Sequence, residues 1–335
     1  MKAAYIRTMA DIEMRETSLW PLAQDEIRIA VKASGICGTD IANAKNGLSK
    51  HSPFGHEVAG TVVETGSAVT RVKKGDTVAL ESASACGACD NCKDTEQELC
   101  TDIKSFFHKT SFGMAEEMIS PALCTLPTHL SPDIACLSEP LGVAIDMIRL
   151  ADITPDSNVL IIGPGTIGLM ALSLVKRMGA RSVFMSGNST NKARIAAAER
   201  FGASIINPDR TPLASYKFPR AIDRIIVTAP PTVLPDAFTV AAKGAIISFI
   251  GIGHGEHAFC RFDVNAFHFK KLQLRASFAS PALYTPLALR YLSDGVLDGN
   301  AIISHRFPLS EIQEAMNVAA DSSRSIKVIV MPEQP

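Results

Sequence analysis

The first part of the chain, residues 1–145, is patterned as a series of short strands. Apolar or alternating runs recur along it: AAYI, EIRIAVKAS, EVAGTVVETG and DTVALES. Gly, Pro and Asp interrupt these runs, and the connectors VKKGD and PFGHE have the composition of turns. We therefore predict a β-rich region over these residues.

From Ser157 the pattern changes to alternating strands and helices. The runs NVLII, SVFMS, ASIIN, RAIDRIIVTA and GAIISFIG are short and apolar, as buried strands are. Between them, TIGLMALSLVKRMGA and TNKARIAAAERFGA have helical spacing, and each ends at a glycine. This alternation predicts an α/β region with a doubly wound parallel sheet over residues 146–280.

The last part of the chain, residues 281–335, has a third pattern. PLALRYLSDG predicts a helix, HRFPLSEIQEAMNVAA a strand followed by a helix, and SIKVIVM a final strand. If the final strand pairs with the β-rich region, residues 1–145 and 281–335 form one domain. The parallel domain, residues 146–280, is then inserted in it.

Composition excludes some classes of function. A length of 335 residues suggests about two domains, and a net charge of -1 gives no general attraction to nucleic acid or an anionic membrane. The N-terminus lacks the apolar run of a signal peptide. The uncharged stretch Ser157–Val175 contains three glycines and a proline, so strand–turn–helix explains it better than a membrane span. We expect a cytoplasmic protein that acts on a small molecule.

Four of the eight cysteines lie in one short stretch, CGACDNCKDTEQELC. They are Cys86, Cys89, Cys92 and Cys100, spaced C-x2-C-x2-C-x7-C. In a cytosolic chain such clustering indicates a metal rather than disulfides. Four thiolates can close a tetrahedral zinc site of the structural kind, and the same run could also hold an iron–sulfur cluster. We favour structural zinc.

A glycine-rich loop follows the strand NVLII and precedes a helix. Its residues are Gly163-Pro164-Gly165-Thr166-Ile167-Gly168. In this context the first glycine permits a tight turn, the second lets a pyrophosphate approach the backbone, and the third lets helix and strand pack closely. The motif predicts a dinucleotide site. The later strands end near Thr228 and Gly251, whose backbones we expect to flank the nicotinamide.

The next strand, SVFMS, ends where the adenosine ribose should lie. The residues there are Ser186-Gly187-Asn188-Ser189-Thr190-Asn191-Lys192-Ala193-Arg194. An enzyme that uses NAD usually has an acid at this point, and none is present. Small and hydroxyl side chains leave room for a 2′-phosphate, and Lys192 or Arg194 could neutralise it. We favour NADP(H), with NAD bound without an acidic clamp as the alternative.

Three separated residues could form a second metal site. They are Cys37, His56 and Glu139, which together make a three-ligand zinc set with an open position for water or substrate. A thiolate and a carboxylate also cancel the charge of the ion. Each residue alone has a simpler structural interpretation, so the prediction depends on their occurring together with the glycine-rich loop.

Together these motifs resemble the zinc-dependent medium-chain dehydrogenases. The matching stretches are Gly35-Ile36-Cys37-Gly38-Thr39-Asp40, Gly55-His56-Glu57, the four-cysteine lobe, Glu139-Pro140-Leu141, the glycine-rich loop and HRFPLSEIQEAM. The resemblance is strongest to the sorbitol and polyol dehydrogenase branch. It implies a GroES-like catalytic domain built from both chain ends, an inserted Rossmann domain, two zinc ions per chain, alcohol–ketone interconversion, and a homodimer or homotetramer.

The resemblance also assigns roles by position. Cys37, His56 and Glu139 match the ligands of the catalytic zinc, and Glu57 matches a neighbouring acid that can approach the metal. Asp40 matches a carboxylate that orients the ring of His56.

The proton path departs from the family. Thr39 matches the hydroxyl that takes the alcohol proton, but Ala42 stands where many members have a relay histidine. Water, the ribose hydroxyls, Glu57 or His51 could receive the proton instead.

The substrate is only weakly indicated. Polar residues between Cys37 and His56 suit a sugar, polyol or cyclitol alcohol or its ketone. Two alternatives stay open: an NADPH-dependent reductase of a biosynthetic ketone, enone or imine with the same fold, and a non-catalytic protein that binds zinc and cofactor.

Overall fold

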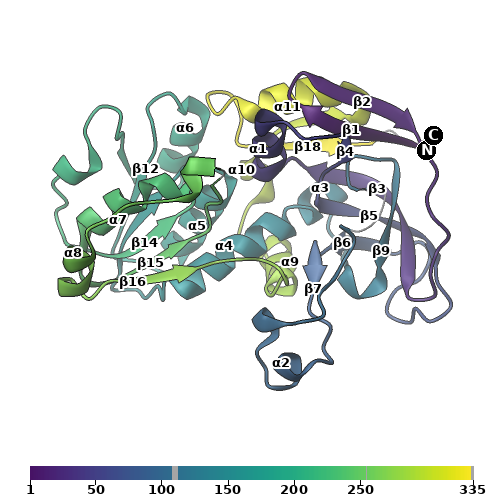
Figure 1. The fold of residues 1–335 in the computed structure, drawn as a ribbon, viewed down its shortest axis with the longest axis horizontal. Coiled ribbons are helices and arrows are strands. Elements are labelled where there is room, and N and C mark those ends of the chain that lie inside the picture. Colours follow the sequence, from purple (N-terminus) through teal and green to yellow (C-terminus); the bar gives the residue numbers. More distant parts are fainter. Residues whose placement is uncertain (108–111, 254, 333–335) are drawn as a thin grey trace. The chain divides into compact units, whose positions relative to one another are not determined.

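The computed structural model describes residues 1–107, 112–253 and 255–332 (Figure 1). They divide into two compact units. The first is built from both ends of the chain, and the second is Val143–Phe278 with the short segment Ser322–Ile326.

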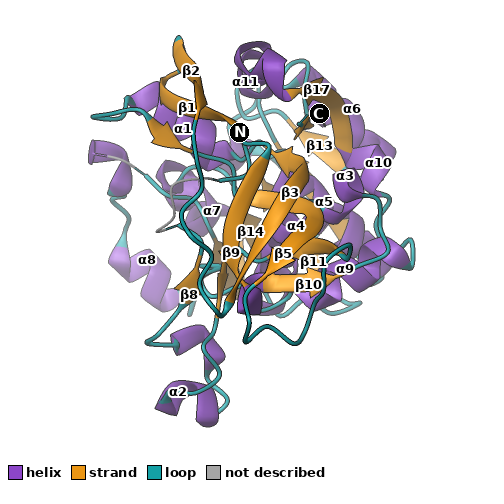
Figure 2. Ribbon diagram, turned by 90° about the vertical axis from the view of Figure 1, so that its right-hand side faces the viewer, coloured by secondary structure: helices purple, strands orange, loops and turns teal. Residues whose placement is uncertain are grey.

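Strands dominate the first unit (Figure 2). They are β1 (Lys2–Thr8), β2 (Asp11–Glu16), β3 (Glu26–Gly35), β4 (Ser52–Pro53), β5 (Glu57–Thr65), β6 (Thr77–Leu80), β7 (Ala83–Ser84), β8 (Lys104–Ser105), β9 (Glu117–Pro121), β10 (Thr125–Pro127), β17 (Ile303–Pro308) and β18 (Lys327–Met331). The main sheet has the order β10-β6-β5-β3-β18-β17, and β9 also pairs with β3. A smaller sheet has the order β2-β1-β4, and β7 pairs with β8.

The central strand β3 explains how the two chain ends meet. Its apolar residues Ile27, Ile29 and Val31 are fully buried in a core shared with β5 and β6. Strand β18 pairs antiparallel with β3, with Ile329 opposite Gly35, and parallel with β17. The terminal strand therefore returns to the β-rich region, as its apolar pattern predicts.

Seven α-helices described by the structure lie in the first unit or begin there. They are α1 (Gly38–Asn46), α2 (Asp90–Lys93), α3 (Pro132–Ala135), α4 (Ser138–Leu150), α9 (Thr285–Ser293), α10 (Gly299–Ile302) and α11 (Ile312–Ala320). Helix α2 belongs to the four-cysteine loop, which extends away from the sheets of its unit (Figure 1). Helix α11 buries Ile312 and Met316 against Val328 and Val330 of β18.

The second unit is built around a six-stranded sheet in which every neighbouring pair is parallel. Its strands are β11 (Asn158–Ile162), β12 (Ser182–Ser186), β13 (Ser204–Ile206), β14 (Ile222–Val227), β15 (Ala241–Phe249) and β16 (Gln273–Ala276). Their order is β13-β12-β11-β14-β15-β16. Counted from β11, this is the 3-2-1-4-5-6 order of a Rossmann fold, which the alternating pattern predicts.

Helices separate these strands along the chain. They are α5 (Thr166–Arg177), α6 (Lys192–Arg200), α7 (Leu234–Val240) and α8 (Val264–Phe269). Strand β11 is buried along its whole length, as expected for a parallel strand covered on both faces. Within the described residues, none of the helices is both long and apolar enough to span a membrane.

Candidate active site

Cys37 lies where strand β3 leads into helix α1. It is the N-cap of the helix, with extended backbone, and its N–H donates to Oδ2 of Asp40 at 2.9 Å. Asp40 is buried. The helix cap therefore fixes the thiol and this carboxylate close to each other.

Three potential metal ligands meet beside this cap. The Sγ of Cys37, a ring nitrogen of His56 and a carboxylate oxygen of Glu57 all lie within 4.8 Å of one another. The register of the sheet produces this meeting, because Gly35 at the end of β3 pairs with Glu57 at the start of β5. Residues twenty positions apart are thus brought together at one end of a strand pair.

His56 is in a strongly negative environment. Its Nδ1 lies 3.9 Å from Oδ1 of Asp40. Burial alone would lower the pKa of His56, but the thiol of Cys37 and the carboxylates of Asp40 and Glu139 raise that pKa well above its ordinary value. A cation is therefore favoured at this position, whether it is the imidazolium or a metal ion.

Glu139 is the second residue of helix α4 and is half-buried. Burial raises the pKa of Glu139 to about 7; the charge of His56 opposes this rise, and the carboxylate of Glu57 adds to it. These interactions place Glu139 in the same electrostatic environment as His56 and Glu57. Its part as a metal ligand stays a prediction.

Lys327, which sequence reasoning missed, reaches this site from strand β18. Its Nζ lies 2.5 Å from Oε1 of Glu57 and donates to the carbonyl oxygen of Ile36 at 2.8 Å. The side chains are 3% and 1% exposed for Lys327 and Glu57. The signal was a charged residue inside the apolar run SIKVIVM, where a buried partner should be expected.

The donor set fits a zinc ion. Thiolate, imidazole and carboxylate are the groups that bind zinc in catalytic sites. Both carboxylate oxygens of Glu57 are buried against the ammonium group of Lys327. The thiol of Cys37 and the imidazole of His56 lie within 4.8 Å of this carboxylate, so three donors of this kind meet at one place.

The four-cysteine lobe fits a closed zinc site. All four Sγ atoms lie within 4.8 Å of one another, and two separations, Cys86 to Cys92 and Cys89 to Cys100, are 3.9 Å. Zinc–sulfur bonds of about 2.3 Å in a tetrahedron place sulfurs about 3.8 Å apart, whereas a disulfide needs about 2.05 Å. Backbone N–H groups of Thr101 and Cys92 lower the pKa of Cys89 to about 6, which favours a thiolate.

The glycine-rich loop connects β11 to α5 in the predicted way. Gly163 has φ +113°, and an added Cβ would lie 2.7 Å from Oγ1 of Thr228. At Gly168 a Cβ would lie 2.0 Å from the carbonyl oxygen of Gly163. At Gly165, the N-cap of α5, a Cβ would meet nothing within 4 Å. The loop is therefore crowded at two glycines and open at the one where a pyrophosphate should approach.

Three further residues predicted to bind the cofactor, Thr228, Gly251 and Thr166, have defined contacts. Thr228 Oγ1 donates to the carbonyl oxygen of Gly163 at 2.8 Å, so it fastens the loop to β14. Gly251 packs tightly, because a Cβ there would lie 2.4 Å from the carbonyl oxygen of Ala229. Thr166 Oγ1 donates to the carbonyl oxygen of Ile326, and Ile167 follows it in α5.

At the ribose end, β12 ends at the buried Ser186, and the buried Gly187 follows it. Asn188 and Lys192 are exposed. A carboxylate that the sequence analysis did not consider lies here: Asp209 accepts from the N–H of Ser189 at 2.8 Å and from its Oγ at 2.5 Å.

Arg194 is partly engaged elsewhere. Its Nε donates to the carbonyl oxygen of Ser325 at 2.9 Å.

The residues named for the proton path do not form a chain of hydrogen bonds. Thr39 is exposed on α1, and Ala42 lies one turn further along the same helix. The Nε2 of His51 lies 2.9 Å from Oδ1 of Asp11 and 3.4 Å from Oε1 of Glu13. His51 is therefore tied to strand β2.

Two family models match the chain, one in each half. The model described as "Alcohol dehydrogenase GroES-like domain" matches residues 23–129, and that described as "Zinc-binding dehydrogenase" matches residues 166–293. Together with the Rossmann order, these matches define a zinc-dependent alcohol dehydrogenase.

Relatives of known activity are similar to this chain over most or all of its length. Sorbitol dehydrogenase of Bacillus subtilis is 28% identical, covering 100% of this chain and 98% of the relative. L-threonine 3-dehydrogenase of Coxiella burnetii is 31% identical, covering 93% of each. An Escherichia coli CFT073 alcohol dehydrogenase (rspB), solved with NADH, has a TM-score of 0.88 at 24% identity over 99% of both chains.

The chain belongs to the zinc-dependent medium-chain dehydrogenase family. The predicted fold and family are confirmed, and the protein is an oxidoreductase that acts on CH–OH groups.

Proposed function

We propose that this protein is a zinc-dependent polyol dehydrogenase, which interconverts a secondary alcohol of a sugar, polyol or cyclitol and the corresponding ketone. The observation that carries the proposal is the meeting of Cys37, His56 and Glu57 at one end of the β3–β5 pair. The name of the sorbitol dehydrogenase relative and the Glu139-Pro140-Leu141 motif support the polyol class over an enone or imine reductase.

The site residues divide the work. Bound zinc supplies a Lewis acid that lowers the pKa of an alcohol, and the nicotinamide supplies the hydride acceptor. Cys37, His56 and Glu139 would hold the zinc, and Asp40 orients the ring of His56. Thr39 Oγ1 takes the alcohol proton. Ala42 cannot titrate, so this proton would pass from Thr39 to ordered water.

A second zinc ion belongs in the four-cysteine lobe, where it has no open position and acts only on structure. The proposal therefore expects two zinc ions per chain, which elemental analysis of the purified protein measures. A chain with one ion, held only by the lobe, would contradict the catalytic part of the proposal.

The cofactor we propose is NADP(H). Among the described residues Asn188 and Lys192 are exposed where a 2′-phosphate would lie, and both can donate to it. The position of Asp209 favours the alternative, NAD. Its carboxylate, which is hydrogen-bonded to Ser189, would repel a 2′-phosphate.

Kinetics with both cofactors, over a panel of polyols, sugars and their ketones, tests the proposed function. We expect turnover of a polyol or its ketone and a lower KM for NADP(H) than for NAD(H). Lys192→Ala should raise the KM for NADP(H) about tenfold or more and leave that for NAD(H) unchanged. A preference for NAD(H) that Asp209→Asn reverses would select the alternative.

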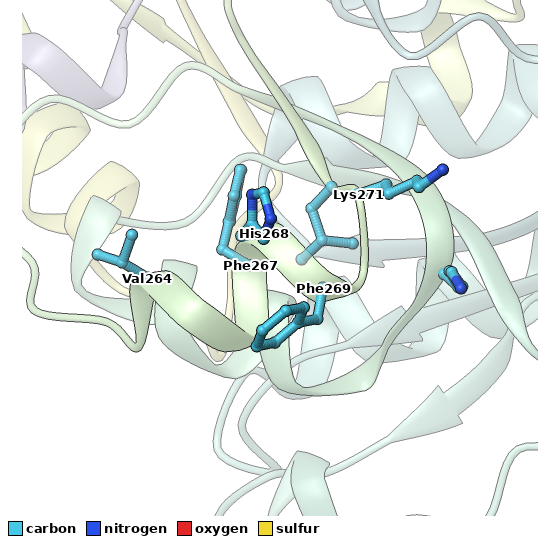
Figure 3. A pocket seen from close by; sticks show the side chains of 7 residues that line it. Val264, Phe267, His268, Phe269 and Lys271 are labelled. Carbon is cyan, nitrogen blue, oxygen red and sulfur yellow. The ribbon is translucent and has the colours of Figure 1, made fainter.

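We also propose a cytoplasmic homo-oligomer, joined at the β16 end of the parallel sheet. Strand β16 pairs only with β15 in the described part of the chain. Helix α8 precedes this strand in the chain, and its residues Val264, Phe267, His268 and Phe269 line a hollow (Figure 3). The hollow has a volume of about 640 Å³. Val264 and Phe269 are 67% and 71% exposed, and an open strand edge next to exposed apolar side chains is typical of an association surface.

A further inference from the structure

The pair formed by Glu57 and Lys327 is built into the main sheet of the first unit. Glu57 starts β5 and Lys327 starts β18, and both strands pair with β3. An added Cβ at Gly35 would lie 1.9 Å from Oε2 of Glu57 and 2.8 Å from Cε of Lys327. Only a glycine at this position leaves room for the two side chains.

The charges of the site show why a cation is needed here. A zinc ion held by the thiolate of Cys37 and the carboxylate of Glu139 is already neutralised. The carboxylate of Glu57 then adds a buried negative charge, and such a charge is costly unless it is paired. Lys327 supplies the pairing charge, and the carbonyl oxygen of Ile36 accepts a further hydrogen bond from its ammonium group.

The position of the carboxylate shows what Glu57 would do without this partner. The carboxylate of Glu57 lies within 4.8 Å of the Cys37 and His56 ligand atoms, and both of its oxygens contact the ammonium group of Lys327. Removing Lys327 would leave the metal as the strongest positive charge near Glu57. The carboxylate would then turn toward the metal and fill the position that a substrate needs.

We propose that Lys327 is a positioning residue that holds Glu57 beside the metal centre and out of its open ligand position. This inference rests on the proposed function, since it requires a metal held by Cys37, His56 and Glu139. The role of Lys327 is electrostatic and directional, so arginine should replace it better than an uncharged side chain of similar length.

The test uses cobalt(II)-loaded protein and imidazole, a ligand that binds to an open metal position. The four-cysteine site is closed, so a change in the visible cobalt spectrum on adding imidazole reports the catalytic site alone. We expect Lys327→Met to weaken imidazole binding at least about tenfold and Lys327→Arg to stay within about threefold of the wild type. The double variant Lys327→Met/Glu57→Gln should restore binding, because the competing carboxylate is gone.

The single variant Glu57→Gln keeps the proposal testable if Lys327→Met does not fold. It should bind imidazole within about threefold of the wild type, since Glu57 does not occupy the open position while Lys327 is present. A tenfold higher imidazole affinity in Glu57→Gln, or an unchanged imidazole affinity in Lys327→Met, would overturn the proposal for Lys327. Either result would leave the proposed function of the protein intact. If the cobalt spectrum of the wild-type protein does not change when imidazole is added, the proposed function is overturned as well.

Discussion

At the scale of single residues, neighbours position three members of the candidate metal site, Cys37, His56 and Glu57. Asp40 accepts from the N–H of Cys37 and lies 3.9 Å from Nδ1 of His56, and Lys327 pairs with Glu57. The carboxylate of Asp40 thus supports both Cys37 and His56. The effect of removing this carboxylate on zinc binding can be measured.

Replacing Asp40 by Asn should weaken zinc binding at the catalytic site by about 10–100-fold, because the amide no longer stabilises the orientation and basicity of His56. Competition with a chelator measures this loss, and the zinc of the four-cysteine lobe should be retained. The exposed Asp294→Asn serves as the control. Equal zinc affinity in the two variants would show that Asp40 does not support the site.

Zinc binding at this site should also depend on pH. Burial raises the pKa of Glu139 to about 7, and the surrounding negative charges raise that of His56 above its ordinary value. Both groups must lose their protons before they bind a metal. The affinity for zinc should therefore rise with pH through about 7.

Calorimetry in buffers of different ionisation enthalpy counts the protons released. The protein used for this titration lacks zinc at the catalytic site and keeps the zinc of the four-cysteine lobe. More protons should be released at about pH 6 than at about pH 8. The same release at both values would contradict the involvement of Glu139 and His56.

At the scale of elements, the β11–α5 loop is held from two sides. Thr228 fastens it to β14, and Thr166 donates to the carbonyl oxygen of Ile326. Ile326 belongs to the segment Ser322–Ile326. In the same segment, the carbonyl oxygen of Ser325 accepts a hydrogen bond from Nε of Arg194 in α6. Backbone and side-chain bonds thus fix the loop while its centre, at Gly165, stays open.

Gly165→Ala should separate cofactor binding from stability. The new methyl group meets no protein atom within 4 Å, so the melting temperature should change by only about 1–2 °C. It enters the space where a pyrophosphate approaches the backbone, and we expect cofactor affinity to fall at least about tenfold. Isothermal titration with NADP⁺ and thermal unfolding measure the two effects.

Gly168→Ala is the matched comparison. Its Cβ would lie 2.0 Å from the carbonyl oxygen of Gly163, so this variant should lose stability as well as cofactor affinity. If Gly165→Ala binds NADP⁺ as the wild type does, the loop is not the pyrophosphate site.

At the scale of the whole molecule, the second unit presents an open sheet edge with exposed apolar side chains. Phe269→Glu should shift the protein toward the monomer by raising the dissociation constant of the oligomer about 100-fold, because a charge would be buried at the contact. Sedimentation velocity measures the shift. Met178→Glu, at another exposed apolar position, should leave the oligomer intact. A monomeric wild type would contradict the proposed association surface.

The sequence by itself determined the features that depend on local spacing. Four cysteines within fifteen residues form one lobe because a short loop cannot separate them. The period of apolar residues fixed the order of strands and helices in the second unit. Glycines at 163, 165 and 168 mark the loop because they follow directly on a strand and precede a helix, a pattern that the local sequence shows by itself.

Only the tertiary structure decided which distant side chains share an environment. Lys327 and Glu57 are 270 positions apart and meet because β18 and β5 both pair with β3. Asp209 reaches Ser189 because β13 lies beside β12. The segment Ser322–Ile326 joins the second unit although its flanks lie in the first. Strand register sets these contacts, and no local pattern of hydrophobic or polar residues encodes which buried charges will face each other across a sheet.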